Sequence, residues 1–435
     1  MDIHDEIESL IDKLGKDYNI LEYVYNGKEF IAGKTPVYYS GPYWNNEEVI
    51  VAIESLLTGK WVSAGEKVKK FEHEFSNKIN QHFGTMVNSG SSANLVMIAA
   101  LKKYYGWNDD DEIIVSVVGF PTTISVISQN GLSPIFIDIE LDSLNFDTSL
   151  IEEKISNKTR AIFLSPVLGN PPDIDDILFI CEKHNLKLIL DCCDSLGTKW
   201  KDKYLGEYAV ASSHSFYPAH TISTAEGGMI TTNIREVSNI AKGISSWGRQ
   251  CVCSGVENLL PNGICNHRFD KWLENYDGIV DHKYVFNYMG YNLKPLDLQG
   301  SIGLVQLTKL DEIMSKRKIS KKEIETVISK HVDNVRFPQS SNLADVVWFG
   351  TPIICESKEQ KQKLISFLEK NKIQTRNYFA GNILLHPGYS HLDDYKKYPN
   401  ANQVLDRVFF LGASPHYDGK IFEYIEDVME GFING

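Results

Sequence analysis

Polar side chains suited to binding an anion or moving a proton gather in three short segments. Residues 88–94 read NSGSSAN and precede an amphipathic run, LVMIAALKKYY. Free N–H groups at a helix start attract a phosphate, although Ser and Gly there are also ordinary caps. Asp191 closes an apolar run, and residues 212–220 form a Ser- and His-bearing segment that ends before a tight turn at Gly227 and Gly228. If the three segments share one edge of a sheet, they can bind a phosphate beside a carboxylate.

The elements that must position these residues are short apolar runs that alternate with amphipathic segments between about residues 85 and 235. The expected strands are DEIIVSVVGF, LSPIFIDIE, TRAIFLSP, LKLILDCCD and AVASSHSF. They are too apolar for strands with one solvated face, which favours a mostly parallel sheet covered by helices on both sides. Such α/β sheets bind ligands at the carboxyl ends of their strands, where Asp191 is expected.

The remainder of the chain predicts a loop, a connecting helix and a second unit. Periodicity disappears over roughly 248–290, and a loop that long is uncommon unless it binds something. Leu and Ile then recur at helical spacing over 298–331, and the segments beyond it read as a smaller α+β domain. We therefore predict an N-terminal arm and helix over 1–50, a large cofactor-binding domain over 51–310 and a C-terminal domain over 311–435.

Composition narrows the class of protein. The chain has 435 residues, with 44 Lys plus Arg against 57 Asp plus Glu and a net charge of −13, so a nucleic-acid partner is not expected. Its 43% hydrophobic and 23% charged residues are ordinary globular composition. The first residues are acidic and periodic, unlike a secretion signal, and no run of 18 uninterrupted apolar residues predicts a membrane span. A cytoplasmic protein without a membrane partner is the expectation.

Six motifs follow one another along the chain: NSGSSAN, GFPTT, LDCCDSLG, SHSFYPAH, EGGMITTN and GYNLKPLDLQGSIGLVQL. In this order they resemble the sugar aminotransferase family (DegT/DnrJ/EryC1 type) of fold-type I, aspartate aminotransferase-like enzymes. The resemblance covers about residues 35 to 430 and implies a pyridoxal phosphate-type cofactor. It places Asp191 on the ring nitrogen, where a carboxylate keeps the ring an electron sink, and Asn292 on the cofactor phosphate of a neighbouring subunit, hence a homodimer. The other cofactor contacts that it implies are Gly90, Ser91, Ser92 and Ser215 on the phosphate and Phe120 stacked on the ring.

The chain departs from the family at the position of its catalytic lysine, which His220 occupies. A histidine forms no stable imine, so the amine form, pyridoxamine 5′-phosphate (PMP), is the expected resident, and the imidazole can still act as a general base. Asp194 and Tyr217 also replace residues usual in aminotransferases; we expect Asp194 to orient groups near the cofactor and Tyr217 to assist acid–base steps. A catalytically inactive, cofactor-binding regulator or scaffold is the alternative from another class.

These replacements resemble the nucleotide-sugar 3-dehydrases, most closely the iron–sulfur type that acts on a CDP-linked 4-keto-6-deoxyhexose in 3,6-dideoxyhexose formation for lipopolysaccharide O-antigen. The resemblance implies a PMP-dependent reaction that removes the C3 hydroxyl, with electrons from a separate flavin and iron–sulfur reductase. Phe349 and Arg376 are expected to line the substrate cleft. The alternative enzymes are a cluster-free 3-dehydratase of a GDP- or dTDP-linked sugar and an atypical sugar aminotransferase.

Four cysteines, Cys193, Cys251, Cys253 and Cys265, are the candidate ligands of a 2Fe-2S cluster. The first two intervals, of 57 residues and of one residue, match the iron–sulfur dehydrase type, but the last, of eleven, is longer than in that type and leaves Cys265 the least secure ligand. Four thiolates complete the two iron tetrahedra of such a cluster. Zinc is the alternative, although paired CxxC knuckles are absent, and disulfides between neighbouring cysteines would need poor geometry. The cysteines expected to be buried apolar residues are Cys181 and Cys355.

Overall fold

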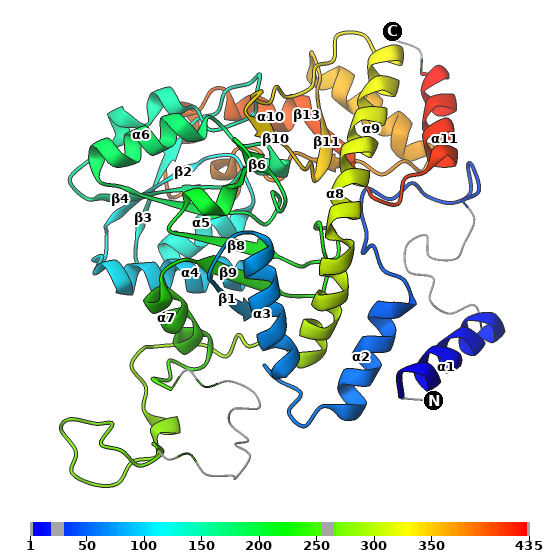
Figure 1. The fold of residues 1–435 in the computed structure, drawn as a ribbon. Coiled ribbons are helices and arrows are strands. Elements are labelled where there is room, and N and C mark those ends of the chain that lie inside the picture. Colours follow the sequence, from blue (N-terminus) through cyan, green and yellow to red (C-terminus); the bar gives the residue numbers. More distant parts are fainter. Residues whose placement is uncertain (1–2, 19–29, 252, 254–264, 266, 433–435) are drawn as a thin grey trace.

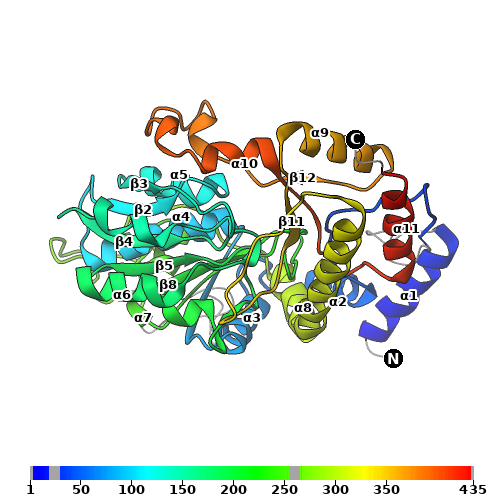
Figure 2. The same ribbon diagram turned by 90° about the horizontal axis from the view of Figure 1, so that it is seen from above.

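The computed structural model describes residues 3–18, 30–251, 253, 265 and 267–432. A large α/β unit and a smaller C-terminal unit lie side by side, with one long helix running along both (Figure 1). Seen from above, the central sheet and its helices occupy one side of the molecule and the C-terminal helices the other (Figure 2). In the ranges given above, no helix combines the length and apolar character needed to cross a membrane.

The large unit is built on a seven-stranded sheet in the order β1-β9-β8-β5-β4-β2-β3. β9 runs antiparallel to β1 and β8, and every other neighbouring pair is parallel, which confirms the predicted mostly parallel sheet. All five predicted strands are present; β1 and β9 were not predicted as strands. The bounds are β1 (Phe83–Val87), β2 (Glu112–Ser116), β3 (Ser133–Ile137), β4 (Thr159–Leu164), β5 (Lys187–Asp191), β8 (Ala211–Ser215) and β9 (Gly228–Thr232).

Helices cover both faces of this sheet. α4 (Gly90–Tyr105), α5 (Pro121–Gln129) and α7 (Arg235–Ser245) pack on one face. α3 (Glu66–Lys78) and α6 (Ile174–His184) cover the other, together with the long helix. Alternate residues of each strand enter opposite cores, as in Ile189 and Leu190 of β5. This two-sided burial is the reason why the strands read as continuous apolar runs.

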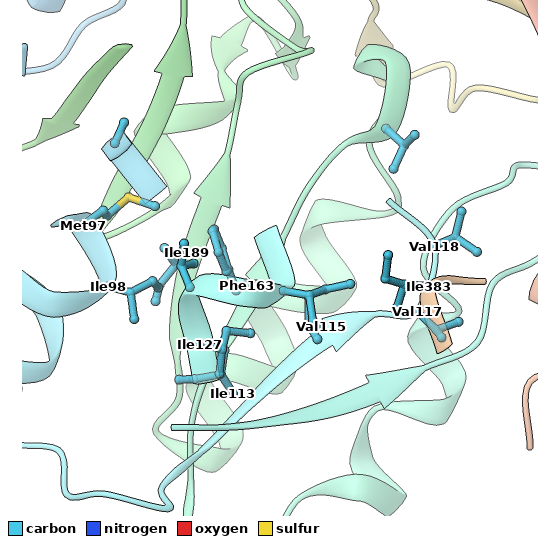
Figure 3. Packing of buried hydrophobic residues seen from close by; sticks show 14 of the residues in the cluster. Met97, Ile98, Ile113, Val115, Val117, Val118, Ile127, Phe163, Ile189 and Ile383 are labelled. Atoms are coloured by element: carbon cyan, nitrogen blue, oxygen red, sulfur yellow. The ribbon is translucent and has the colours of Figure 1, made fainter. Parts of the chain in front are cut away.

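The core on the α4 face extends into the C-terminal unit. Val117 and Val118 follow β2 and pack with Ile383 (Figure 3). The Ile383 N–H donates to the Val117 carbonyl at 3.0 Å, and a backbone bridge joins Val118 to Asn382. The two units therefore share buried surface where the sheet ends, which fixes the walls of any cavity at that edge.

α8 (Asp297–His331) is the connecting helix that the sequence predicts, and it crosses the predicted domain boundary at residue 310 without a break. The C-terminal unit has an antiparallel sheet in the order β11-β13-β12, from β11 (Gly350–Ile354), β12 (Arg376–Asn377) and β13 (Val408–Gly412). Its helices are α9 (Lys358–Lys370), α10 (Ala401–Arg407) and α11 (Gly419–Glu430). N-terminal to the large unit lie α1 (Ile3–Tyr18) and α2 (Asn46–Thr58).

The apolar segment of residues 344–355 is divided between the two units. Its start, β10 (Ala344–Asp345), joins a small sheet with β6 (Lys199–Trp200) and β7 (Lys203–Tyr204), whereas its end is β11. Between them, Phe349 N–H donates to the Leu168 carbonyl of the large unit at 2.9 Å. The break places Phe349 at the boundary between the units.

The long irregular loop predicted over 248–290 contains one short 3-10 helix, His282–Tyr284, among its described residues. Backbone bridges hold its ends together, between Arg249 and Phe286 and between Ser246 and Asn292. The described parts of the loop are otherwise irregular; its residues 252, 254–264 and 266 lie outside the described part of the chain.

Candidate active site

A cavity of about 640 Å³ opens at the carboxyl ends of the parallel strands, between the large unit and the C-terminal sheet. Asp191 at the end of β5 and Ser215 at the end of β8 line it, which is where the sequence places the site. Among its described lining residues there is no lysine. The sequence-predicted residues that line the cavity are Gly90, Ser91, Phe120, Asp191, Cys193, Asp194, Ser215, Tyr217, His220, Phe349 and Arg376.

The start of α4 forms a cradle for an anion. Ser89 caps the helix, and its Oγ accepts from the Ser92 N–H at 3.1 Å. A Cβ on Gly90 would lie 2.5 Å from the Ser215 Cβ, so this position admits only glycine. Gly90 therefore lets the helix start pack directly against Ser215, and the N–H groups at the start of a helix suit a phosphate. Ser92 itself supports the cap rather than lining the cavity, since its hydroxyl pairs with that of Ser89 at 3.0 Å.

Asp191 is buried and held from two sides. Its Oδ2 accepts from Asn94 Nδ2 and from Thr123 Oγ1, each at 2.7 Å, and its Oδ1 accepts from the Cys193 N–H at 3.2 Å. A carboxylate with these donors is fixed in direction and can pair with a protonated ring nitrogen. The roles of Asn94 and Thr123 were not predicted, although both residues lie inside the quoted motifs NSGSSAN and GFPTT.

His220 and Asp194 form a second polar pair in the cavity. His220 Nδ1 lies 3.6 Å from Asp194 Oδ1 and, within the part of the chain that the structure covers, this buried nitrogen has no hydrogen-bond partner. Burial, helped by the charge of Arg317, lowers the pKa of His220 to about 3. Burial, helped by the charge of Asp191, raises the pKa of Asp194 to about 7. At neutral pH the imidazole is therefore an uncharged base next to a carboxyl group near its midpoint.

Aromatic rings surround the mouth of the cavity. The Phe349 ring lies 5.2 Å from the His220 ring, and the Phe120 ring lies 5.9 Å from that of Phe379. The Arg376 guanidinium sits 4.2 Å from the centre of the Tyr39 ring. Tyr39, Phe379 and Phe410 were missed in the sequence because they stand in no motif and reach the cavity only through the packing of the C-terminal unit.

The candidate cluster ligands do not gather in one place. Cys193 lines the cavity, whereas Cys251 and Cys253 line a smaller hollow near Met86, and Cys265 lines neither. All four cysteines are described, and no three of their sulfurs lie within 4.8 Å of one another. As predicted, Cys181 and Cys355 are buried among apolar side chains.

Asn292 lies outside the cavity of its own chain. It is exposed, and its Oδ1 accepts from Lys294 Nζ at 2.6 Å. An Asn292 that contacts a cofactor would therefore have to reach the site of another subunit.

Comparisons with known proteins agree with this geometry. The DegT/DnrJ/EryC1/StrS aminotransferase family matches residues 44–430. The chain is 33% identical over 419 residues to lipopolysaccharide biosynthesis protein RfbH of Salmonella typhimurium, covering 93% of each protein. It is 34% identical over 414 residues to dTDP-4-dehydro-2,6-dideoxy-D-glucose 3-dehydratase of Saccharopolyspora spinosa, covering 93% of this chain and 88% of that one. Among solved structures, E. coli GDP-4-keto-6-deoxy-D-mannose-3-dehydratase with bound hydrated PLP matches with a TM-score of 0.79 and 28% identity, over 91% of this chain and all of that one.

Proposed function

The chain belongs to the DegT/DnrJ/EryC1/StrS aminotransferase family, and on that premise we propose that it is a PMP-dependent dehydratase that removes the C3 hydroxyl of a nucleotide-linked 4-keto-6-deoxyhexose. One observation carries the proposal. The cavity presents His220 where family aminotransferases use a lysine, and its described lining contains no lysine that could take that place. Without an imine-forming amine on the protein, the cofactor amine is free to meet the sugar ketone.

The residues of the cavity fit the cofactor. The cradle of Gly90, Ser91 and Ser215 suits its phosphate, the fixed carboxylate of Asp191 suits its ring nitrogen, and Phe120 offers a ring face. When bound, the cofactor supplies a primary amine that joins a ketone and a ring that accepts an electron pair. Asp191 supports that role because a carboxylate against the nitrogen keeps the nitrogen protonated.

His220 is the proposed base. Its lowered pKa leaves the imidazole unprotonated at neutral pH. Its place in the cavity would let it take a proton from the carbon next to the amine of a bound cofactor. Asp194 stands near Nδ1 and, once ionised, stabilises the imidazolium that forms. Tyr217 is half exposed in the cavity, with its ring centre 6.3 Å from that of His220, so we assign it to protonation of the departing hydroxyl.

The proposal also specifies the nucleotide of the substrate and the source of the electrons. Two of the three named relatives carry a dTDP- or GDP-linked sugar in their names, which favours one of these nucleotides over CDP. Removing the hydroxyl while keeping the ketone needs two electrons; in the cluster-free route an amino acid supplies them, ending as a 2-oxo acid with release of ammonia. We assign Phe349 and Arg376, which line the cavity, to the sugar and the diphosphate. We assign Asn292, which does not line the cavity of its own chain, to the site of a second subunit in a homodimer.

The 2Fe-2S cluster with a separate flavin and iron–sulfur reductase is the second candidate route, in which the substrate carries CDP. Its support is the position of Cys193, whose sulfur lies 3.0 Å from where a Cβ on Gly90 would stand, at the base of the phosphate cradle. Cys193 lines a different hollow from Cys251 and Cys253, and this separation and the names of two relatives favour the cluster-free route. Iron and sulfide analysis after anaerobic purification decides between them: about two irons per chain supports the cluster, and an active, iron-free protein excludes it.

The test of the function is product analysis. PMP-loaded protein is incubated separately with GDP-, dTDP- and CDP-linked 4-keto-6-deoxyhexoses, each with glutamate or with a reductase. The masses of the sugar products are then measured by mass spectrometry. The proposal expects a product lighter by one oxygen atom with at least one nucleotide. An amino sugar in place of that product would identify an aminotransferase, and unchanged sugars under every condition would favour the regulator or scaffold.

A further inference from the structure

Arg317 is a buried cation with no part in the steps above. It lies in the middle of α8, its side chain is 0% exposed, and it does not line the cavity. Over the described ranges it forms no ion pair with a carboxylate within 4.0 Å. Burying a charged guanidinium without a paired anion costs free energy of desolvation. The hydrogen bonds that the Arg317 side chain forms must offset this cost.

All of its hydrogen bonds go to backbone carbonyls. Arg317 Nη2 donates to the carbonyls of Ala219 and His220, each at 2.9 Å. Nη1 donates to the carbonyls of Phe349 at 3.1 Å and Ala413 at 3.4 Å. One side chain thus binds the segment of the proposed base, the segment before β11 and the segment after β13.

Neighbouring hydroxyls reinforce the same segments. Ser40 Oγ donates to the Ala219 carbonyl at 2.7 Å, and Ser320, one turn beyond Arg317 on α8, donates to the Ser414 carbonyl at 2.7 Å. The guanidinium carbon also lies 5.7 Å from the centre of the Phe349 ring, and the His220 ring is one of the neighbours of that ring. The Arg317 side chain therefore contacts both the segment of His220, the proposed base, and Phe349, the aromatic residue next to it.

We propose that Arg317 is a positioning residue, which holds the carbonyls of His220 and Phe349 on one guanidinium and so fixes the imidazole relative to the substrate wall of the cavity. The inference rests on the proposed function of His220. A shift of about 1 Å in the base is enough to slow a proton transfer roughly a hundredfold.

The charge of Arg317 gives a second, separable effect. It disfavours protonation of His220, so its removal should raise the pKa of that imidazole. A lysine keeps the charge but cannot hold four carbonyls. The other titratable groups coupled to this cluster are Asp191, Cys193, Tyr378, His416 and Tyr417.

The experiment compares Arg317→Met and Arg317→Lys with a matched control, Arg407→Met. Arg407 is half-buried in α10, donates to the Cys355 carbonyl at 2.9 Å and does not line the cavity. Both Arg317 variants should keep the wild-type affinity for PMP and lose about a hundredfold in kcat, with a smaller change in KM. The inference is overturned if kcat falls only in proportion to the folded fraction or if Arg407→Met causes the same loss.

A readout without cofactor or turnover is the rate at which diethyl pyrocarbonate modifies His220, measured by peptide mass spectrometry against the exposed His267. We expect modification several-fold faster in both Arg317 variants than in wild type or Arg407→Met; equal rates in all four proteins contradict the inference. If modification of His220 accelerates but wild type dehydrates no sugar, the proposed function fails and the positioning role stands. If wild type dehydrates and the Arg317 variants match it in turnover and labelling, only the inference fails.

Discussion

The two ends of the cavity hold their polar groups in different ways. At the cradle end, formed by Gly90, Asp191 and Ser215, the carboxylate accepts four hydrogen bonds, two of them at 2.7 Å, and the helix start is capped. At the base end, formed by Asp194 and His220, Nδ1 is buried without a partner among the described residues, and both pKa values are displaced by burial. Fully bonded groups bind and orient, whereas groups held away from their ordinary pKa values can exchange protons. The comparison assigns binding to the cradle end and chemistry to the base end.

The largest expected effect is at the base end. His220→Asn should lower dehydration by about 10³-fold, because it removes the proposed base while keeping a polar side chain of similar size. Binding of PMP, measured by fluorescence titration, should stay within about threefold of wild type, since the cradle end is untouched. A joint loss of both properties would show that the two ends are not separable.

The next effect is at the cradle end. Gly90→Ala should weaken PMP binding roughly tenfold to a hundredfold, because the added methyl group would overlap the Ser215 side chain. Saturating PMP should restore most of the turnover. Gly388→Ala, where a Cβ meets nothing within 4 Å, is the control and should bind PMP as wild type does. An unchanged affinity in Gly90→Ala would argue against the assignment of the phosphate site.

The pH dependence sharpens the comparison further. Asp194, with a pKa of about 7, becomes protonated as the pH falls and can then no longer stabilise the imidazolium. We therefore expect kcat/KM to fall by about tenfold for each pH unit below that value. Asp194→Asn should be slower than wild type at pH 8 but flat between pH 6 and 8. The same acidic limb in both proteins would assign the titration to another group.

The smallest effect concerns stability. The folded-state pKa of Asp194 is raised above its unfolded value, so the folded state binds the proton more tightly and its ionisation destabilises the fold as the pH rises from about 4 through 7. Asp194→Asn should thus be more stable than wild type at pH 8, by up to about 4 kcal/mol for a shift of about three pKa units, with the gain vanishing near pH 4. Urea midpoints at equal protein concentration measure this difference. A less stable Asp194→Asn at pH 8 would show that the ionised carboxylate stabilises the fold.

The same contrast explains what could be predicted from the sequence. The strands and the cradle end were predicted because each depends on local pattern: apolar runs, a Gly- and Ser-rich helix start and an Asp at a strand end. The antiparallel insertion of β9 between β1 and β8 depends on long-range pairing, which local pattern does not encode. Arg317, Phe379 and Phe410 reach the site only because the C-terminal unit packs against the sheet edge. Their side chains would read as ordinary core or surface residues in any sequence window.

The cysteines show that sequence spacing alone cannot identify the ligands of a cluster. Cys193 was expected near the cofactor and lines the cavity, but interval matching could not tell whether Cys251, Cys253 and Cys265 converge on it. Convergence depends on the path of the loop after α7, which includes residues outside the described part of the chain. The ligand set stays a prediction that iron analysis tests.

The central claim is that dehydration replaces amine transfer because a histidine, and no imine-forming lysine, faces the cofactor amine. The most direct test is borohydride reduction of the protein loaded with pyridoxal phosphate, followed by peptide mapping. We expect unmodified peptides throughout and release of the intact cofactor on denaturation. A lysine that carries the reduced pyridoxyl group would contradict the account.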